Sequence, residues 1–284
     1  MLVTTLRIGV VMWPIQPWPE SRELWRRAEE LGFAHAWIYD HTAWRGHTPW
    51  YDAYPTLAAA AAITSRIRLG TLVTSPNFRH PVPTAHAVRT IDQISGGRLE
   101  LGIGAGGSAH SSDGDLLDDD WTGRQRSERF AEWVTMLDRL LREPSATYRG
   151  EYWSARDVAL GVGGVQRPRV PFAIAATGPR GLRLAARHAR TWIANDDLPT
   201  VRTQLDTLAQ ACDAEGRDVA EVRKLLMTGF TDDPWLESPA AFEDLAGRHA
   251  EAGITDVVIH WPRPGTAWDC DPKVFEAIAA LGTG

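Results

Sequence analysis

The fold is decided by the stretch Ser95-Gly96-Gly97-Arg98-Leu99-Glu100-Leu101-Gly102-Ile103-Gly104-Ala105-Gly106-Gly107. Its first two glycines permit the left-handed turn that ends a helix. The apolar side chains of Leu99, Leu101 and Ile103 then form a short run of the kind that is buried in a parallel sheet. Glycines follow at the carboxyl end of this predicted strand. Because they lack a Cβ, they either let a flat ligand approach the backbone closely or simply turn the chain.

The segments on either side of this strand alternate between strand and helix patterns along the chain. Eight strand–helix units in regular order predict the α/β class, as a single (β/α)8 TIM barrel of one domain over residues 1–284. The predicted strands are 6–12, 36–39, 67–73, 99–103, 171–176, 191–194, a segment within 222–229, and 255–260. The predicted helices that follow them are 21–31, 55–64, 83–94, 124–141, 180–190, 200–215, 239–252 and 272–281.

Two segments after the fourth strand depart from this rhythm. Residues 108–123 are polar and acidic, and we expect a solvated, mobile loop there. Residues 148–166 are aromatic, glycine-rich and aperiodic, which predicts an insertion of short strands outside the barrel.

Composition narrows the classes of function. The chain of 284 residues has a net charge of −6 and no basic stripe, which argues against nucleic acid or an anionic membrane as a partner. The only two cysteines, Cys212 and Cys270, have no metal-site or disulfide spacing, so we expect a reducing cytoplasm. Residues 1–11 lack the pattern of a signal peptide, and no apolar run approaches the ~20 residues of a membrane span.

Polar residues that follow the barrel strands are the candidates for chemistry, because active sites of such barrels lie at that face. Asp40 and His41 follow the second strand. This pair could transfer a proton or bond the polar edge of a ring. It could equally be an aspartate that caps the loop beside a histidine bonded to backbone. The scattered histidines lack the spacing of a helical zinc site, so we expect no metal.

A second turn of interest, Gly178-Pro179-Arg180-Gly181, follows the fifth strand. Backbone N–H groups at a helix N-terminus beside an arginine favour a phosphate. The alternative is a helix begun by proline with a surface arginine. Several of the tryptophans fall in predicted loops, where they could wall a pocket for an apolar or planar ligand: Trp13, Trp18, Trp44 and Trp50.

Together these motifs resemble the luciferase-like monooxygenase superfamily. The resemblance rests on Asp40-His41, Leu69-Gly70-Thr71 with Pro76 and His80-Pro81, Ser95 to Gly107, and Ala175-Ala176-Thr177-Gly178-Pro179. It runs from the first strand to the eighth. Within the superfamily the chain is most similar to the deazaflavin-dependent oxidoreductases, which use coenzyme F420.

The resemblance implies an F420 ring in the mouth of the barrel, with its phosphate near Thr177 to Gly181. Asp40 would bond the ring edge, and His41 and Trp44 would be the catalytic pair that flanks the reacting carbon. A cis peptide bond between Leu72 and Val73 would support the ring, and the family favours a homodimer. The cofactor contacts that it implies are Asp40, Leu72, Val73, Thr74, Gly104, Gly106, Gly107, Ala175, Ala176, Thr177, Gly178, Arg180 and Gly181.

One departure from the pattern bears on the substrate. Gly107 stands where the sugar-phosphate dehydrogenases of the family carry a catalytic glutamate, so that acid is absent at this position. The expected function is hydride transfer between C5 of the deazaflavin and a small organic substrate. Two alternatives stay open: a monooxygenase that uses reduced FMN, and a flavin- or F420-binding protein without turnover.

Overall fold

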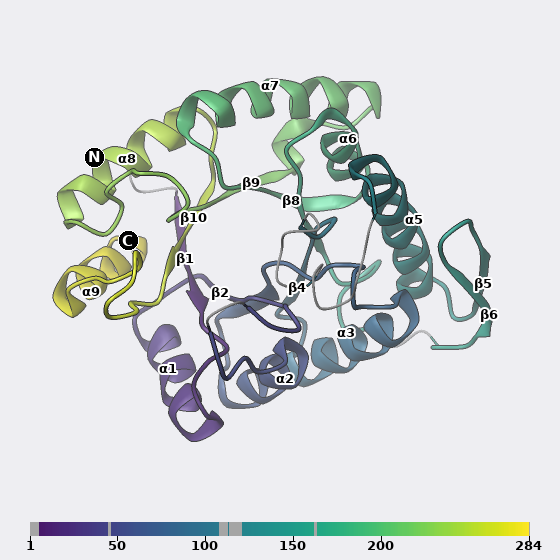
Figure 1. Cartoon of the computed structure of the whole chain (residues 1–284), viewed down its shortest axis with the longest axis horizontal. Coiled ribbons are helices and arrows are strands. Elements are labelled where there is room, and N and C mark those ends of the chain that lie inside the picture. The colour runs from purple at the N-terminus through teal and green to yellow at the C-terminus, as the bar shows by residue number, and fades with distance from the viewer. Residues whose placement is uncertain (1–5, 45–46, 108–112, 114–120, 162–163, 284) are drawn as a thin grey trace.

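The computed structural model describes residues 6–44, 47–107, 113, 121–161 and 164–283. Eight parallel strands close into a barrel in the order β1-β10-β9-β8-β7-β4-β3-β2, which confirms the predicted α/β barrel (Figure 1). The strands are β1 (Arg7–Met12), β2 (His35–Ile38), β3 (Arg68–Thr71), β4 (Leu99–Ile103), β7 (Phe172–Ala175), β8 (Ala189–Ala194), β9 (Arg223–Met227) and β10 (Asp256–His260).

Helices surround the barrel on its outside (Figure 1). They are α1 (Trp18–Glu30), α2 (Ala53–Ile63), α3 (Pro81–Ser95), α5 (Gly123–Arg142), α6 (Pro179–His188), α7 (Leu198–Ala214), α8 (Pro239–Glu251) and α9 (Pro272–Ala280). Several begin earlier than the sequence pattern predicts, because a proline occupies the first turn, where its missing N–H costs no helical hydrogen bond. Gly96 ends α3 with a φ of 63°, as its sequence predicts.

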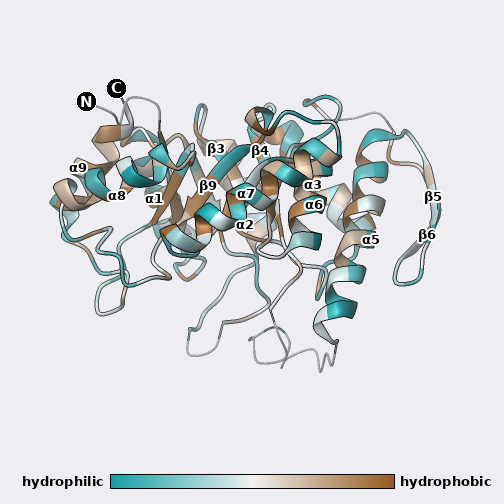
Figure 2. Cartoon of the chain, turned by 90° about the horizontal axis from the view of Figure 1, so that it is seen from above, coloured by the Kyte–Doolittle hydropathy of each residue, from teal (hydrophilic) through white to brown (hydrophobic). Residues whose placement is uncertain are grey.

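The predicted insertion is a two-stranded antiparallel hairpin of β5 (Ala146–Arg149) and β6 (Ser154–Val158). It begins two residues earlier than expected and lies apart from the barrel, beside α5 (Figure 2). Because the hairpin stays outside the barrel, β4 pairs directly with β7, and this pairing is part of the closed barrel. The predicted mobile loop of residues 108–123 falls mostly outside the described residues.

The interior of the barrel differs at its two ends. At the amino ends of the strands, His35 Nε2 lies 3.0 Å from Asp256 Oδ1, and Trp37 Nε1 donates to His35 Nδ1 at 2.7 Å. Gly9 on β1 makes room for this network, since a Cβ there would lie 1.9 Å from His35 Nδ1. Toward the carboxyl ends the side chains are apolar and aromatic, among them Trp13, Tyr39, Leu72 and Ile193. The floor of the barrel mouth is therefore apolar.

Candidate functional site

A cavity of about 1030 Å³ opens at the carboxyl ends of the barrel strands. Most of the residues that the sequence places at the site line it: His41, Trp44, Leu72, Val73, Gly104, Gly106, Gly107, Ala175, Ala176, Thr177, Gly178, Arg180 and Gly181. Segments far apart in the chain, from the β2 end to the first turn of α6, thus meet around one space. Asp40 and Thr74 are the two predicted residues that do not reach its wall.

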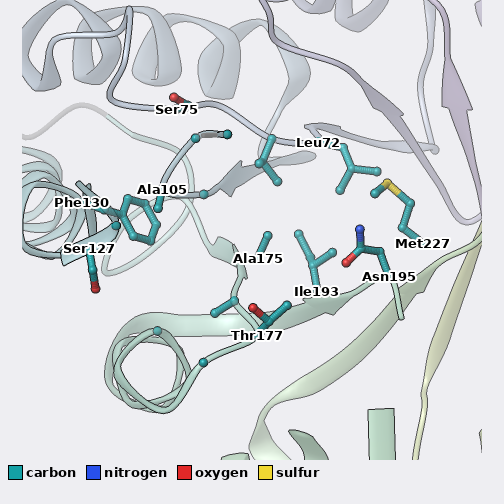
Figure 3. A pocket seen from close by; sticks show the side chains of 18 of the residues that line it. Leu72, Ser75, Ala105, Ser127, Phe130, Ala175, Thr177, Ile193, Asn195 and Met227 are labelled. Atoms are coloured by element: carbon teal, nitrogen blue, oxygen red, sulfur yellow. The ribbon is translucent and has the colours of Figure 1, made fainter. Parts of the chain in front are cut away.

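The floor of the cavity is apolar. Leu72, Ala175 and Ile193 point into the cavity (Figure 3). The peptide bond between Leu72 and Val73 is cis, as the family resemblance implies. Gly104 lies directly against this segment, because a Cβ on it would be 2.8 Å from Val73 Cγ2. The lack of a Cβ at Gly104 therefore lets the end of β4 pack closely against this part of the floor.

The outer end of the cavity is formed by the first turns of α5 and α6. Gly178 caps α6 without any side-chain hydrogen bond, and a Cβ on it would meet no atom within 4 Å. The first N–H groups of α6 are therefore left for another acceptor, beside the exposed side chain of Arg180. Arg124 at the start of α5 also lines this end, while it pairs with Glu128 at 2.7 Å. Two cations and a helix N-terminus suit a phosphate or other anion.

His41 is held by an acid that the sequence did not reveal. His41 Nδ1 lies 2.5 Å from Asp113 Oδ2, and the backbone N–H of Thr42 donates to Asp113 Oδ1 at 2.8 Å. Trp44 packs against the same imidazole, with ring centroids 4.8 Å apart. Both His41 and Asp113 line the cavity. With Nδ1 occupied by the carboxylate, Nε2 is the ring nitrogen left to exchange a proton with a ligand.

Asp40 does not line the cavity, and its expected bond to a ring edge stays a prediction. Its side chain is fully buried, and Arg79 Nη2 and Nε donate to its two oxygens at 2.6 and 3.2 Å. Thr74 Oγ1 donates to Asp40 Oδ2 at 2.7 Å. Burial alone would lower the pKa of Arg79, but the carboxylates of Asp40 and Asp52 raise it, so the guanidinium stays charged. Asp40 therefore fixes the ends of β2 and β3 relative to each other.

A smaller cavity of about 30 Å³ adjoins the large one on its aromatic side. Three of the tryptophans that the sequence predicts to wall a pocket, Trp13, Trp44 and Trp50, line it. The fourth, Trp18, instead begins α1, is 36% exposed and lines neither cavity. Its prediction was wrong because Pro17 and Pro19 start a helix where the pattern suggested a loop.

Sequence reasoning missed several lining residues. Phe130 and Ser127 reach the cavity from α5, and Asn195 and Met227 lie at the ends of β8 and β9 (Figure 3). Phe230, which follows β9, also lines the cavity. The last three could have been found by the rule applied to Asp40, because each lies at or just after a strand end. Within the described part of the chain, no group of three or more His, Cys, Asp and Glu could hold a metal ion.

The sequence model of one protein family matches residues 2–255, and its description is luciferase-like monooxygenase. The chain belongs to the luciferase-like monooxygenase family. One curated relative, an F420-dependent glucose-6-phosphate dehydrogenase of Beutenbergia cavernae, is 35% identical over 218 residues, or 73% of this chain and 62% of the relative. This chain thus spans less than two thirds of that protein's length.

Two further proteins cover more of the chain at lower identity. The 5,10-methylenetetrahydromethanopterin reductase of Methanopyrus kandleri is 26% identical over 95% of this chain and 78% of its own length. The solved structure of an F420-dependent secondary alcohol dehydrogenase superposes with a TM-score of 0.80 over 96% of this chain and 99% of that chain, at 19% identity. The latter likeness supports the fold alone.

Proposed function

We propose that this protein is an F420-dependent oxidoreductase that acts on a small organic substrate. The observation that carries the proposal is the shape of the large cavity, which runs from an apolar floor at Leu72 and Val73 to the uncapped N-terminus of α6. A planar apolar ring and an anionic tail on one ligand match these two ends. The names of relatives in the same family, several of them F420-dependent, support the choice of F420.

The residues of this chain fit such a cofactor. Leu72, Val73, Ala175 and Ile193 would pack against its ring, and the N–H groups of the first turn of α6 with Arg180 would hold its phosphate. When bound, F420 supplies the carbon that accepts or donates a hydride. The protein contributes the position of the substrate, the exclusion of water and the handling of a proton.

The His41–Asp113 pair is the proposed proton-handling group. The Asp113 carboxylate keeps a proton on His41 Nδ1, so the neutral ring presents Nε2 as a base, and the protonated ring presents it as an acid. Asp113 thereby supplies a carboxylate to the site although Gly107 supplies none. We propose His41 as the catalytic residue, with Trp44 fixing its ring plane, and Asp113 as the residue that positions it.

Titration of the purified protein with F420 and separately with FMN tests the cofactor assignment. We expect quenching of tryptophan fluorescence to saturate with F420 at a concentration at least tenfold below that needed for FMN. Preference for FMN would instead favour the reduced-FMN monooxygenase. Tight F420 binding without reduction or oxidation by any candidate substrate would favour a binding protein without turnover.

Two further expectations remain proposals. We propose a homodimer, which light scattering of the purified protein would detect as a mass near twice 31.4 kDa. We also propose a cytoplasmic location, supported by the two free cysteines. No helix among the described residues has the length and apolar character needed to cross a membrane.

A further inference from the structure

The mouth of the barrel has two chemically different halves. The proposed cofactor half is built from the ends of β3, β4, β7 and β8 and the first turns of α5 and α6. The other half is built from the segments that follow β1, β2, β9 and β10, and it contains the small cavity of about 30 Å³. Six aromatic side chains line this small cavity: Trp13, Tyr39, Trp44, Trp50, Phe230 and Trp268.

The two cavities share part of their lining. Tyr39, Trp44 and Phe230 line both, so the two cavities meet at these three side chains. Trp13, Trp50 and Trp268 line only the small cavity and form its far wall. His41 lies beside two of the shared side chains, with its ring centroid 4.8 Å from that of Trp44 and 6.1 Å from that of Tyr39. A molecule that reacts beside His41 therefore lies next to the small cavity.

The walls of the small cavity select against charge. None of the described residues that line it is ionised: Tyr39 is neutral because burial raises its pKa, and the others are indoles or phenyl rings. The cations of the large cavity, Arg124 and Arg180, come from α5 and α6 on the cofactor side. A phosphate group on the substrate would have no charged partner among these aromatic walls.

The indole N–H groups of the far wall are enclosed by protein. Trp13 Nε1 donates to the backbone oxygen of Trp261 at 2.8 Å. Trp50 Nε1 and Trp268 Nε1 are buried and have no acceptor within the described part of the chain. Because these nitrogens are buried, the far wall presents ring carbon rather than N–H groups to a ligand.

The size of the cavity limits what it can hold. By the same measure of volume, about 10–15 Å³ accommodates one water molecule. A cavity of about 30 Å³ therefore admits two or three non-hydrogen atoms, which is less than an aromatic ring.

We propose that this aromatic cavity is the substrate subsite, that it receives the short alkyl end of a small uncharged substrate, and that Trp268 limits the length of that end. The proposal rests on the proposed function for the reaction but makes a separate claim about binding. It also separates this chain from its curated relative, whose name gives glucose 6-phosphate as the substrate.

Binding of a series of methyl ketones tests the subsite. Dissociation constants for propan-2-one, butan-2-one, pentan-2-one and hexan-2-one are measured by saturation-transfer NMR on the F420-loaded protein. In the wild type we expect affinity to rise about fourfold for each buried methylene and to stop rising by pentan-2-one. In Trp268→Leu the rise should continue through hexan-2-one, and in the milder Trp268→Phe the limit should move less.

Trp18→Leu is the matched control, because it removes an exposed indole that lines neither cavity and should leave the series unchanged. Equal affinity for all four ketones in the wild type would overturn the proposal, and so would an unchanged limit in folded Trp268→Leu or Trp268→Phe. Displacement of the ketones by glucose 6-phosphate at a lower concentration would also overturn it.

The same samples distinguish failure of the subsite from failure of the proposed function. F420 binding is followed by its own fluorescence, and the ketone series is repeated without cofactor. If F420 does not bind but the ketone series shows the predicted length limit, the proposed function is refuted and the subsite is supported. Tight F420 binding with no length limit would refute the subsite alone.

Discussion

At the scale of single residues, the account depends most on His41 and its contact with Asp113. We expect His41→Ala to lower turnover on the order of 10²–10⁴-fold, because a positioned acid or base contributes that much to a proton-transfer step. F420 affinity should change little, since the imidazole packs beside Trp44, next to the aromatic cavity, rather than at the apolar floor. Steady-state kinetics and an F420 titration of the same variant make the comparison.

Asp113→Asn tests whether the carboxylate positions His41. The amide keeps the size of the side chain but cannot favour the same protonated form of the ring. We expect a loss of turnover about tenfold smaller than in His41→Ala and a changed pH profile between pH 5 and 8. If Asp113→Asn keeps the wild-type rate and profile, the proton-handling role proposed for the pair is wrong.

His260 gives a prediction about stability. Burial lowers the pKa of His260 to about 3, and its Nε2 lies 2.6 Å from the Tyr39 hydroxyl. The unfolded chain binds a proton on this ring below pH 6.5 and the folded chain does not, so stability falls as the pH drops from 6.5. From pH 7 to pH 5 the loss should be about 2 kcal/mol.

Urea unfolding of His260→Gln at both pH values isolates this contribution. Gln places an amide nitrogen near the position of Nε2 and cannot titrate, so its loss over the same range should be about 2 kcal/mol smaller. Asp138 and Asp256 do not interfere. Burial would raise the pKa of both carboxyl groups, but His188 and Arg169 lower the pKa of Asp138, and His35 lowers that of Asp256. The stability that these two carboxylates contribute is therefore lost only below about pH 4. Equal losses in the two proteins would contradict the neutral, buried state of His260.

The residue scale also shows where reading the sequence fails. His41 was identifiable because it follows a strand, and that rule needs only local pattern. Asp113 was not, because its contact with His41 joins positions 72 residues apart through a segment without periodicity. Asp40 follows the same strand as His41, yet its side chain turns to Arg79, which no local pattern predicts.

At the scale of elements, the N-terminus of α6 is the proposed phosphate site. Arg180→Ala should weaken F420 binding about tenfold, near the lower end of the range for a charge-assisted contact because the side chain is exposed. A deazaflavin that lacks the phosphate should bind both proteins equally. Calorimetric titration with the two ligands makes the comparison.

Arg183→Ala is the matched control, since Arg183 lies one turn further along α6, is exposed and does not line the cavity. Its effect on F420 affinity should be small. Equal weakening by Arg180→Ala for both deazaflavins would place Arg180 away from the phosphate. Equal weakening of F420 binding by both substitutions would reduce the role of Arg180 to general charge.

Elements were the most predictable level of the structure. Each of the eight barrel strands was expected from a short apolar run, and each overlaps its predicted range. The boundaries were less accurate: β3 ends at Thr71, although the sequence pattern predicted a strand over residues 67–73. The first turns were also misplaced where proline precedes the apolar pattern, as at the start of α3.

At the scale of the whole molecule, the barrel brings together two half-sites, one from the first two and last two barrel strands and one from the four barrel strands between them. The ends of β1, β2, β9 and β10 contribute aromatic side chains, and those of β3, β4, β7 and β8 contribute the apolar floor with the adjoining helix turns. The order of the strands around the barrel makes each group contiguous. This division follows from closure of the barrel, which is why the individual motifs predicted the cofactor half better than the aromatic half.

A crystal structure of the F420 complex would test the central claim most directly. The account predicts density for the ring against Leu72 and Val73, and density for the phosphate within hydrogen-bonding distance of the N–H groups in the first turn of α6. The small aromatic cavity should remain free of cofactor. A ring bound in the aromatic half, or a phosphate bound away from α6 in crystals saturated with F420, would contradict the account.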